Sequence, residues 1–234
     1  LFRRAKSYTG NDCLIIAGTG SNSTAHTVQM SIAAQESGAD ALLVVSPYYN
    51  KPTPEGLYAH YLSVAHSVSI PVIAYNVPSR TGLNIAPETL KELSKVENIV
   101  AVKEASGNIS QIAQIAHLCG DDIDIYSGND DQIVPLMSLG GKGVISVLSN
   151  ILPKETHDLT SFCLGGDFAK GTELQLKYLK LINALFCEVN PIPVKAAMSA
   201  MGFCENYLRM PLTPMEDANK AKLFALMRAE GLIK

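Results

Sequence analysis

Residues 41–75 read ALLVVSPYYNKPTPEGLYAHYLSVAHSVSIPVIAY. Two uninterrupted apolar runs, 41–45 and 71–75, enclose a segment with helical spacing that opens on Thr53-Pro54, a capping residue followed by an N1 proline. Apolar runs without polar alternation are typical of strands that are buried on both faces of a parallel sheet. The stretch therefore predicts a strand, a crossover helix over 54–68 and a second, parallel strand.

The same alternation of strand and helix extends on both sides of this unit. Further strands are predicted over 14–17, 99–102, 123–126 and 143–147, and further helices over 23–37, 87–96, 109–118 and 130–139. Glycines at 38, 120 and 140 stand where three of these helices should end. After Ser149 the pattern changes, and helices are predicted over 154–164, 168–187, 193–201 and 216–230.

We interpret residues 1–150 as a partial (β/α) barrel of about six βα units, and 151–234 as the last barrel helix with a C-terminal helical extension. No Gly-, Ser- or Pro-rich linker divides the chain, so one continuous domain is expected. Two α/β architectures fit the pattern: a doubly wound open sheet, or a TIM (β/α)8-type barrel that lacks its first two βα units. The chain opens at Leu1 inside a helical pattern, which favours a missing beginning.

Composition excludes several classes of protein. The net charge of −3 and the scattered charges give no basis for binding nucleic acid or an anionic membrane. The five cysteines are far apart in the sequence and form no CxxC pair, and the five histidines lack the spacing of metal ligands. Neither a disulfide framework nor a metal site is therefore expected. No apolar run approaches the ~20 residues that span a bilayer, and a cytoplasmic location is the simplest interpretation.

The segment Gly18-Thr19-Gly20-Ser21-Asn22-Ser23 follows a predicted strand and precedes a predicted helix, as a dinucleotide-binding motif would. Serine replaces the third glycine, and the next strand ends in Val45-Ser46-Pro47 instead of the expected acidic residue. The motif fails on both counts. We therefore predict a tight turn between a strand and a helix.

Polar residues that end apolar strands are the candidate catalytic groups. Lys103 ends the run Val100-Ala101-Val102, where a low dielectric at the mouth of a barrel would lower its pKa and leave a neutral, nucleophilic amine. Tyr75 ends another strand, and its phenol suits proton transfer. Arg80 follows in a turn and suits a carboxylate. Each residue alone also fits an ordinary solvated strand end, so single positions do not decide.

The motifs taken together are more specific. GTGSN, SPYYNKP, YNVPSRTG, VKEASGN, YSGND, GGKGVIS and NPIPVKAAM occur in that order from about residue 12 onward, and this arrangement closely resembles the dihydrodipicolinate synthase family. The resemblance implies a (β/α)8 barrel and a lyase that condenses pyruvate with aspartate-4-semialdehyde in lysine and diaminopimelate biosynthesis. It implies no metal or organic cofactor, only an imine between pyruvate and Lys103, and a homotetramer built from tight dimers.

The resemblance also assigns roles to individual residues. Lys103 would form the Schiff base, Tyr75 would donate and accept protons, and Tyr49 would join a proton relay from the neighbouring subunit. Arg80 would bind the carboxylate of the second substrate, while Ile145 and Gly128 would line the pyruvate pocket. Lys195, on a predicted helix, is interpreted as structural.

Two departures from the family pattern qualify these roles. The family's Gly-Thr-Thr-Gly-Glu loop, which relays protons and binds pyruvate, has no counterpart among these 234 residues. The resemblance implies a glutamate, in family members that lysine inhibits, at the position that His26 occupies in this chain. Weak or absent inhibition by lysine is therefore expected. Two alternatives remain: another pyruvate aldolase of the N-acetylneuraminate lyase superfamily, and a catalytically impaired scaffold.

Overall fold

The computed structural model describes residues 1–234, which form two compact units. The first unit comprises Leu1–Gly128 with Leu139–Lys142, and the second comprises Asn129–Ser138 with Gly143–Lys234. The expected division near residue 150 and the expectation of one continuous domain stay predictions.

The first unit contains a parallel sheet whose strands follow one another in chain order. Its strands are β1 (Ile16–Gly18), β2 (Ala41–Val45), β3 (Val72–Asn76), β4 (Ile99–Glu104) and β5 (Asp124–Ser127). Its helices are α1 (Phe2–Thr9), α2 (Thr24–Glu36), α3 (Pro54–Ser67), the short α4 (Pro78–Thr81), α5 (Pro87–Leu93) and α6 (Ile109–Cys119), with the 3-10 turn η1 (Gly120–Asp122). The predicted helices begin at the expected caps, since the side chains of Ser23 and Thr53 accept N–H groups of α2 and α3.

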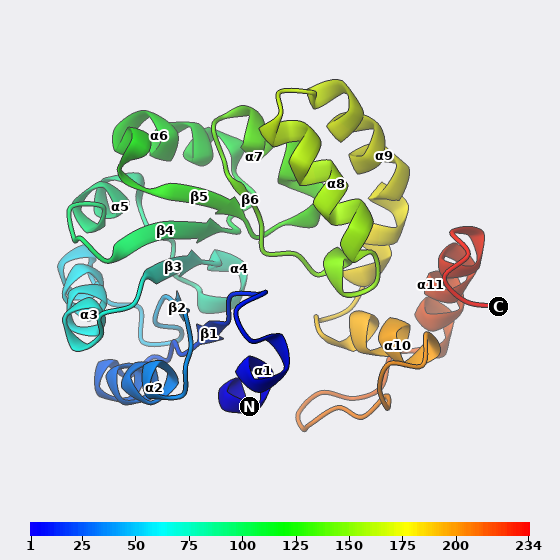
Figure 1. Cartoon of the computed structure of the whole chain (residues 1–234), viewed down its shortest axis with the longest axis horizontal. Coiled ribbons are helices and arrows are strands. Elements are labelled where there is room, and N and C mark those ends of the chain that lie inside the picture. The colour runs from blue at the N-terminus through cyan, green and yellow to red at the C-terminus, as the bar shows by residue number, and fades with distance from the viewer. The chain divides into compact units, whose positions relative to one another are not determined.

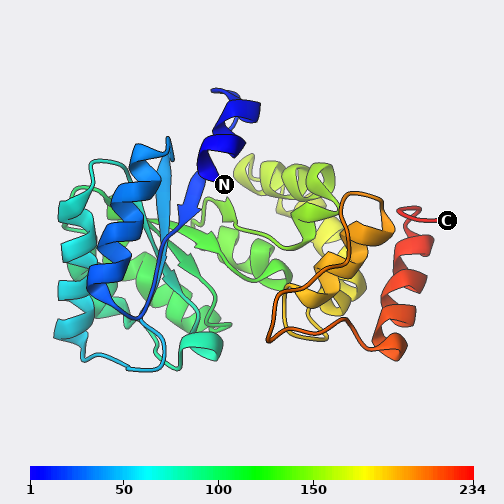
Figure 2. The same cartoon turned by 90° about the horizontal axis from the view of Figure 1, so that it is seen from below.

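The connecting helices α2, α3, α5 and α6 lie along one face of this sheet, as Figures 1 and 2 show from two directions. Consecutive helices also pack on one another, α2 on α3, α3 on α5 and α5 on α6. A doubly wound sheet reverses its strand order and carries helices on both faces. The observed order and one-sided cover instead fit a TIM-barrel-like α/β fold.

Side chains alternate strictly across the middle of the sheet. Leu42, Val44, Val72 and Ala74 are fully buried on the face that carries the helices. Their neighbours in sequence point to the opposite face, because successive residues of a strand point to opposite sides. The helix-facing side of the sheet therefore forms the core of the first unit.

A β-bulge interrupts the pairing of β3 with β4. Val72 pairs with Ile99, but Ile73 pairs with Ala101, so Val100 has no partner in this ladder. An extra residue of this kind changes which face the following side chains occupy. From Ala101 onward the odd-numbered residues of β4, including Lys103, lie on the face opposite the helices.

The second unit is mainly helical. It contains β6 (Gly143–Val144), the 3-10 turns η2 (Asp130–Gln132) and η3 (Leu148–Asn150), and α7 (Ile133–Ser138), α8 (Pro153–Leu164), α9 (Phe168–Leu185), α10 (Ile192–Ala200) and α11 (Asp217–Ala229). The strand predicted over 143–147 ends early. The backbone N–H groups of Val147 and Leu148 each donate to Oδ2 of buried Asp130 at 2.9 Å instead of continuing a ladder.

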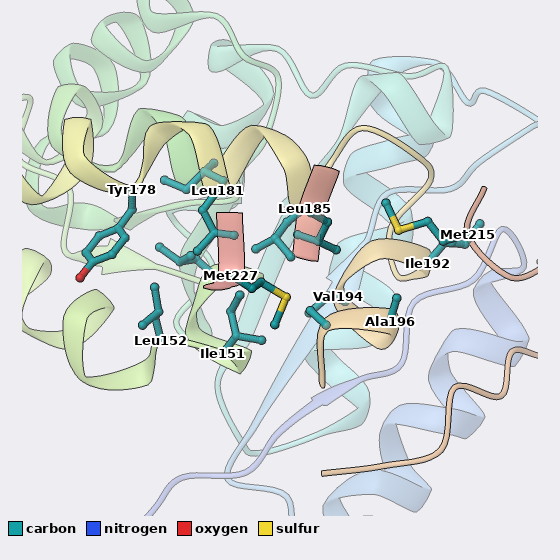
Figure 3. Packing of buried hydrophobic residues seen from close by; sticks show 14 residues of the cluster. Ile151, Leu152, Tyr178, Leu181, Leu185, Ile192, Val194, Ala196, Met215 and Met227 are labelled. Carbon is teal, nitrogen blue, oxygen red and sulfur yellow. The ribbon is translucent and has the colours of Figure 1, made fainter. Parts of the chain in front are cut away.

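One apolar cluster holds this unit together (Figure 3). Leu181 and Leu185 of α9 pack with Met227 of α11 and with Val194 and Ala196 of α10, all nearly inaccessible to solvent. The C-terminal helices are thus parts of a shared core. None of the helices combines the length and the apolar character that crossing a membrane requires.

Candidate active site

Four side chains form a row at the C-terminal ends of β2 to β5. Val45 pairs with Tyr75, Tyr75 with Lys103, and Lys103 with Tyr126. Paired residues of parallel strands share a face, so all four lie on the side of the sheet opposite the helices. The Nζ atom of Lys103 is 4.3 Å from the centroid of the Tyr75 ring. The structure therefore places the predicted nucleophile beside the predicted proton donor.

Tyr75 is half-buried, and its surroundings favour the protonated phenol. Burial raises the pKa of Tyr75, while the Arg80 guanidinium opposes part of that rise. A raised pKa keeps the phenol protonated at neutral pH, as the predicted role of proton donor requires. Arg80 is exposed in the last turn of α4, and its effect on Tyr75 shows that its charge acts at the same end of the sheet.

Lys103 is half-buried at the end of β4 and contacts the face of an aromatic ring. A cation above an aromatic face is attracted by the ring quadrupole, and this contact holds Nζ next to Tyr75. The lowered pKa expected from the sequence stays a prediction. The contact fixes the position of Nζ whichever form predominates.

Gly128 follows β5 and leaves room for the Lys103 side chain. A Cβ atom at residue 128 would stand 2.6 Å from the Ala105 Cβ and 3.0 Å from the Lys103 Cε. The backbone N–H of Gly128 donates to the Glu104 carbonyl oxygen at 2.8 Å, which fixes this close approach. A side chain at residue 128 would therefore crowd Ala105 and the Lys103 side chain.

Two predicted site residues do not belong to this row. Tyr49 is 89% exposed on the loop after β2, where its φ of 74° is unusual for a residue with a side chain. Its backbone N–H donates to the Thr81 carbonyl oxygen at 3.4 Å. Ile145 belongs to the second unit, where it follows β6 and is partly buried. The roles assigned to both residues stay predictions.

The turn after β1 is tight, as predicted. A Cβ atom at Gly20 would stand 2.4 Å from the backbone nitrogen of Val45, so only glycine fits there. Ser23 then caps α2. No group of three or more His, Cys, Asp or Glu side chains is arranged to hold a metal ion.

Sequence reasoning missed two features of the site. Tyr126 ends a predicted strand and begins the YSGND motif, but the sequence assigns it no role, although the register sets it beside Lys103. Burial raises the pKa of Tyr126, and Asp124 raises it further. The second feature is a buried pair, Asn76 and Glu104, behind the row. The signal for the pair was present, because β3 and β4 both end in two consecutive polar residues.

Comparisons with known proteins point to one family. The model of the dihydrodipicolinate synthetase family matches residues 1–230. A protein of Caldicellulosiruptor saccharolyticus named 4-hydroxy-tetrahydrodipicolinate synthase is 64% identical over 206 residues, which cover 88% of this chain and 70% of that protein. A protein of the same name from Clostridium perfringens is 54% identical over 220 residues, covering 94% of this chain and 76% of the relative.

Solved structures give the same result. The dihydrodipicolinate synthase of Aquifex aeolicus is 43% identical with a TM-score of 0.97, covering 99% of this chain and 79% of that chain. The enzyme of Thermotoga maritima is 41% identical with a TM-score of 0.97, covering 99% and 80%. The match along nearly the whole sequence and the close agreement in fold lead to one conclusion: the chain belongs to the dihydrodipicolinate synthetase family.

Proposed function

We propose that the chain is a Schiff-base-forming lyase that condenses pyruvate with aspartate-4-semialdehyde to 4-hydroxy-tetrahydrodipicolinate, a step of lysine and diaminopimelate biosynthesis. The relatives named for this synthase, at up to 64% identity, support the reaction. One observation from the structure carries the proposal further. Lys103 and Tyr75 are register partners on one face of the sheet, with Nζ 4.3 Å from the ring centroid.

The chemistry follows from these two side chains. The neutral amine of Lys103 adds to the C2 carbonyl of pyruvate, and loss of water leaves an iminium. Loss of a C3 proton from this electron sink gives an enamine, whose C3 forms the new carbon–carbon bond with the aldehyde carbon. The aldehyde oxygen takes a proton as the bond forms. Tyr75 is the proposed donor, because burial keeps its phenol protonated. The amino group that came from aspartate semialdehyde then attacks the imine carbon, which closes the ring and releases the Lys103 amine.

The remaining site residues take supporting roles in the proposal. Arg80 binds the carboxylate of aspartate semialdehyde through its planar guanidinium. Gly128 gives Lys103 and the pyruvate imine their space, as the 3.0 Å approach to Cε supports. Ile145 lines the pyruvate pocket.

Partners and location follow the same reasoning. We propose a homotetramer of tight dimers in which Tyr49 reaches the neighbouring subunit. Its 89% exposure, on a backbone with positive φ, supports a side chain held out for a partner. The reaction needs no cofactor beyond the imine on Lys103, and the protein acts in the cytoplasm. Sedimentation of the wild type and of Tyr49→Ala tests the oligomer, since the variant should dissociate more readily.

Borohydride reduction in the presence of pyruvate tests the central claim. The imine is reduced to a stable secondary amine, and peptide mass mapping should find the adduct on Lys103. Lys103→Ala should yield no adduct. An unmodified Lys103 in the wild type, after saturating pyruvate and reductant, would refute the proposed function.

Two further measurements separate the alternatives. A sugar aldehyde has no carboxylate to meet Arg80, so the proposal expects faster turnover with aspartate semialdehyde than with sugar aldehydes. The reverse order would favour a sugar aldolase. An adduct on Lys103 without any condensation would instead favour the catalytically impaired scaffold.

A further inference from the structure

A second polar pair lies directly behind the row that holds Tyr75 and Lys103. Asn76 and Glu104 are register partners one residue further along β3 and β4, and they point to the helix-facing side. Their exposed fractions are 0% and 1%. The Asn76 Nδ2 donates to the Glu104 Oε2 at 2.9 Å. Burying a carboxylate is costly unless hydrogen bonds compensate it, so its other partners matter.

The Glu104 carboxylate accepts hydrogen bonds from uncharged donors. Its Oε1 accepts the backbone N–H of Ser106 at 2.6 Å, and its Oε2 also accepts Nε2 of Gln111, from the first turn of α6, at 3.2 Å. A carboxylate can only accept hydrogen bonds, whereas an amide has one donating and one accepting end. Glu104 therefore fixes which way the amides of Asn76 and Gln111 are turned.

The network closes on itself through Asn84, which lies between α4 and α5. Asn84 and Gln111 exchange two hydrogen bonds, at 2.7 and 3.1 Å, and Asn76 Nδ2 donates to Asn84 Oδ1 at 2.9 Å. Asn76 Oδ1 accepts the backbone N–H of Ile85 at 2.9 Å. Glu104 thus ties together the ends of β3 and β4, the segment before α5 and the start of α6.

The same peptide unit that carries Glu104 also bounds the site. The Glu104 carbonyl oxygen accepts the N–H of Gly128, and Ala105 N–H donates to the Asn76 carbonyl oxygen at 2.9 Å. A shift of Glu104 would therefore move Gly128 against the Lys103 stem, and would move the end of β4 relative to Tyr75. A buried network with every member satisfied holds such groups more rigidly than separate hydrogen bonds.

From these contacts we propose that Glu104 is a positioning residue for the imine chemistry, acting on Lys103 and Tyr75 through the strand ends. This inference rests on the proposed function. It differs from a purely stabilising role in one respect: loss of the carboxylate should slow the reaction in molecules that remain folded, because the reacting groups lose their alignment.

Glu104→Gln tests the inference with the smallest change of shape. The amide nitrogen must face either the Ser106 N–H or the two side-chain amides, so a donor meets a donor. The readout is borohydride trapping of the pyruvate imine, corrected for the folded fraction. The maximal rate should fall about tenfold, while the half-saturating pyruvate concentration changes less than about threefold, because alignment and not binding is lost.

Two companion variants keep the result interpretable. Gln111→Leu removes one hydrogen-bond donor from the carboxylate and should lower the maximal rate by about threefold. This variant tests the positioning role of Glu104 if Glu104→Gln does not fold. Asn98→Ala is the control, because Asn98 donates to the Ala65 and Val68 carbonyl oxygens at the opposite end of β4. It should reduce stability but leave the imine rate per folded molecule unchanged.

The outcomes separate the two proposals. If the wild type forms no imine, the proposed function fails and the role of Glu104 fails with it. If the wild type forms the imine and folded Glu104→Gln does so at the same rate, only the positioning role is overturned. An equal loss of rate in Asn98→Ala would also overturn it, because general loosening of the fold would then explain the effect.

Discussion

Replacing Gly128 by alanine should damage the site through lack of space alone. The new Cβ would stand 2.6 Å from the Ala105 Cβ, 3.0 Å from the Lys103 Cε and 3.3 Å from the Glu104 carbonyl oxygen. Carbon atoms in ordinary contact are about 3.5–4.0 Å apart, so the contact with Ala105 is short by roughly 0.9–1.4 Å and the contact with Lys103 by roughly 0.5–1 Å. Gly128 is not among the residues with positive φ, so backbone conformation adds nothing to the cost.

The structure indicates which groups would give way. Ala105 is 9% exposed and lies on backbone held by the Asn76 carbonyl oxygen, so it has little freedom to retreat. The Lys103 side chain is flexible and should move away. Overpacking of this kind costs about 1–3 kcal/mol of unfolding free energy. Misplacing a nucleophile by about 1 Å should slow imine formation by about 10- to 100-fold.

Thermal unfolding and a time course of borohydride trapping with pyruvate measure the two effects. Gly18→Ala is the matched control, because Gly18 also lies at the C-terminal end of a strand but its Cβ would meet nothing within 4 Å. The control should keep both wild-type stability and wild-type rate. A Gly128→Ala protein with the wild-type trapping rate would refute the steric reasoning, and so would an equal loss in Gly18→Ala.

Four other results are expected. Arg80→Ala should raise the KM for aspartate semialdehyde by about 10- to 100-fold without slowing imine formation with pyruvate, since a charge-assisted hydrogen bond of about 1.5–3 kcal/mol is lost. Steady-state kinetics with each substrate varied would show this effect. An unchanged KM would contradict the assigned role. Asp130→Asn should lower the unfolding free energy by about 1–3 kcal/mol in denaturant titrations, because a buried and a partly buried backbone N–H group lose their carboxylate acceptor. Burial raises the pKa of Tyr61 and Tyr75. Their contribution to stability is therefore complete below pH ~10, where unfolded tyrosine ionises, and is lost as the pH rises through the folded pKa. The unfolding free energy should fall in alkali, and Tyr61→Phe should flatten that fall. With His26 exposed on α2, lysine should not inhibit the enzyme at submillimolar concentration. Inhibition assays measure this, and a submillimolar inhibition constant would contradict the prediction.

Much of the fold was predictable from local pattern. The apolar runs at 41–45 and 71–75 became β2 and β3, and the cap at Thr53 began α3, because burial on both faces and capping are short-range requirements. The predicted strand over 143–147 was too long, since the acceptor that ends it is the side chain of Asp130, 17 residues before Val147 in the chain. Contacts of that range leave no periodic signal.

The candidate site was predictable as residues but not as geometry. Family motifs singled out Lys103 and Tyr75, yet nothing in the sequence states that the two strands stand in a register that pairs them. Counting alternate residues from buried Ile99 would even place Lys103 on the helix-facing side. Glu104 was missed because a charged residue at a strand end is ordinarily solvated, and its burial depends on Asn84 and Gln111, which come from other elements.

The bulge at Val100 has a consequence for comparing and altering relatives of this chain. Because Val100 lacks a partner on β3, removing it would leave Ile99 and Ala101 in regular succession with Lys103 still on its own face. A one-residue gap at this position in an alignment is therefore compatible with an intact nucleophile. A gap of the same size between Ala101 and Lys103 would turn Lys103 to the helix-facing side and bring its neighbour Glu104 to the opposite face. Such a gap would mark a protein that has lost the reaction while keeping nearly the same sequence.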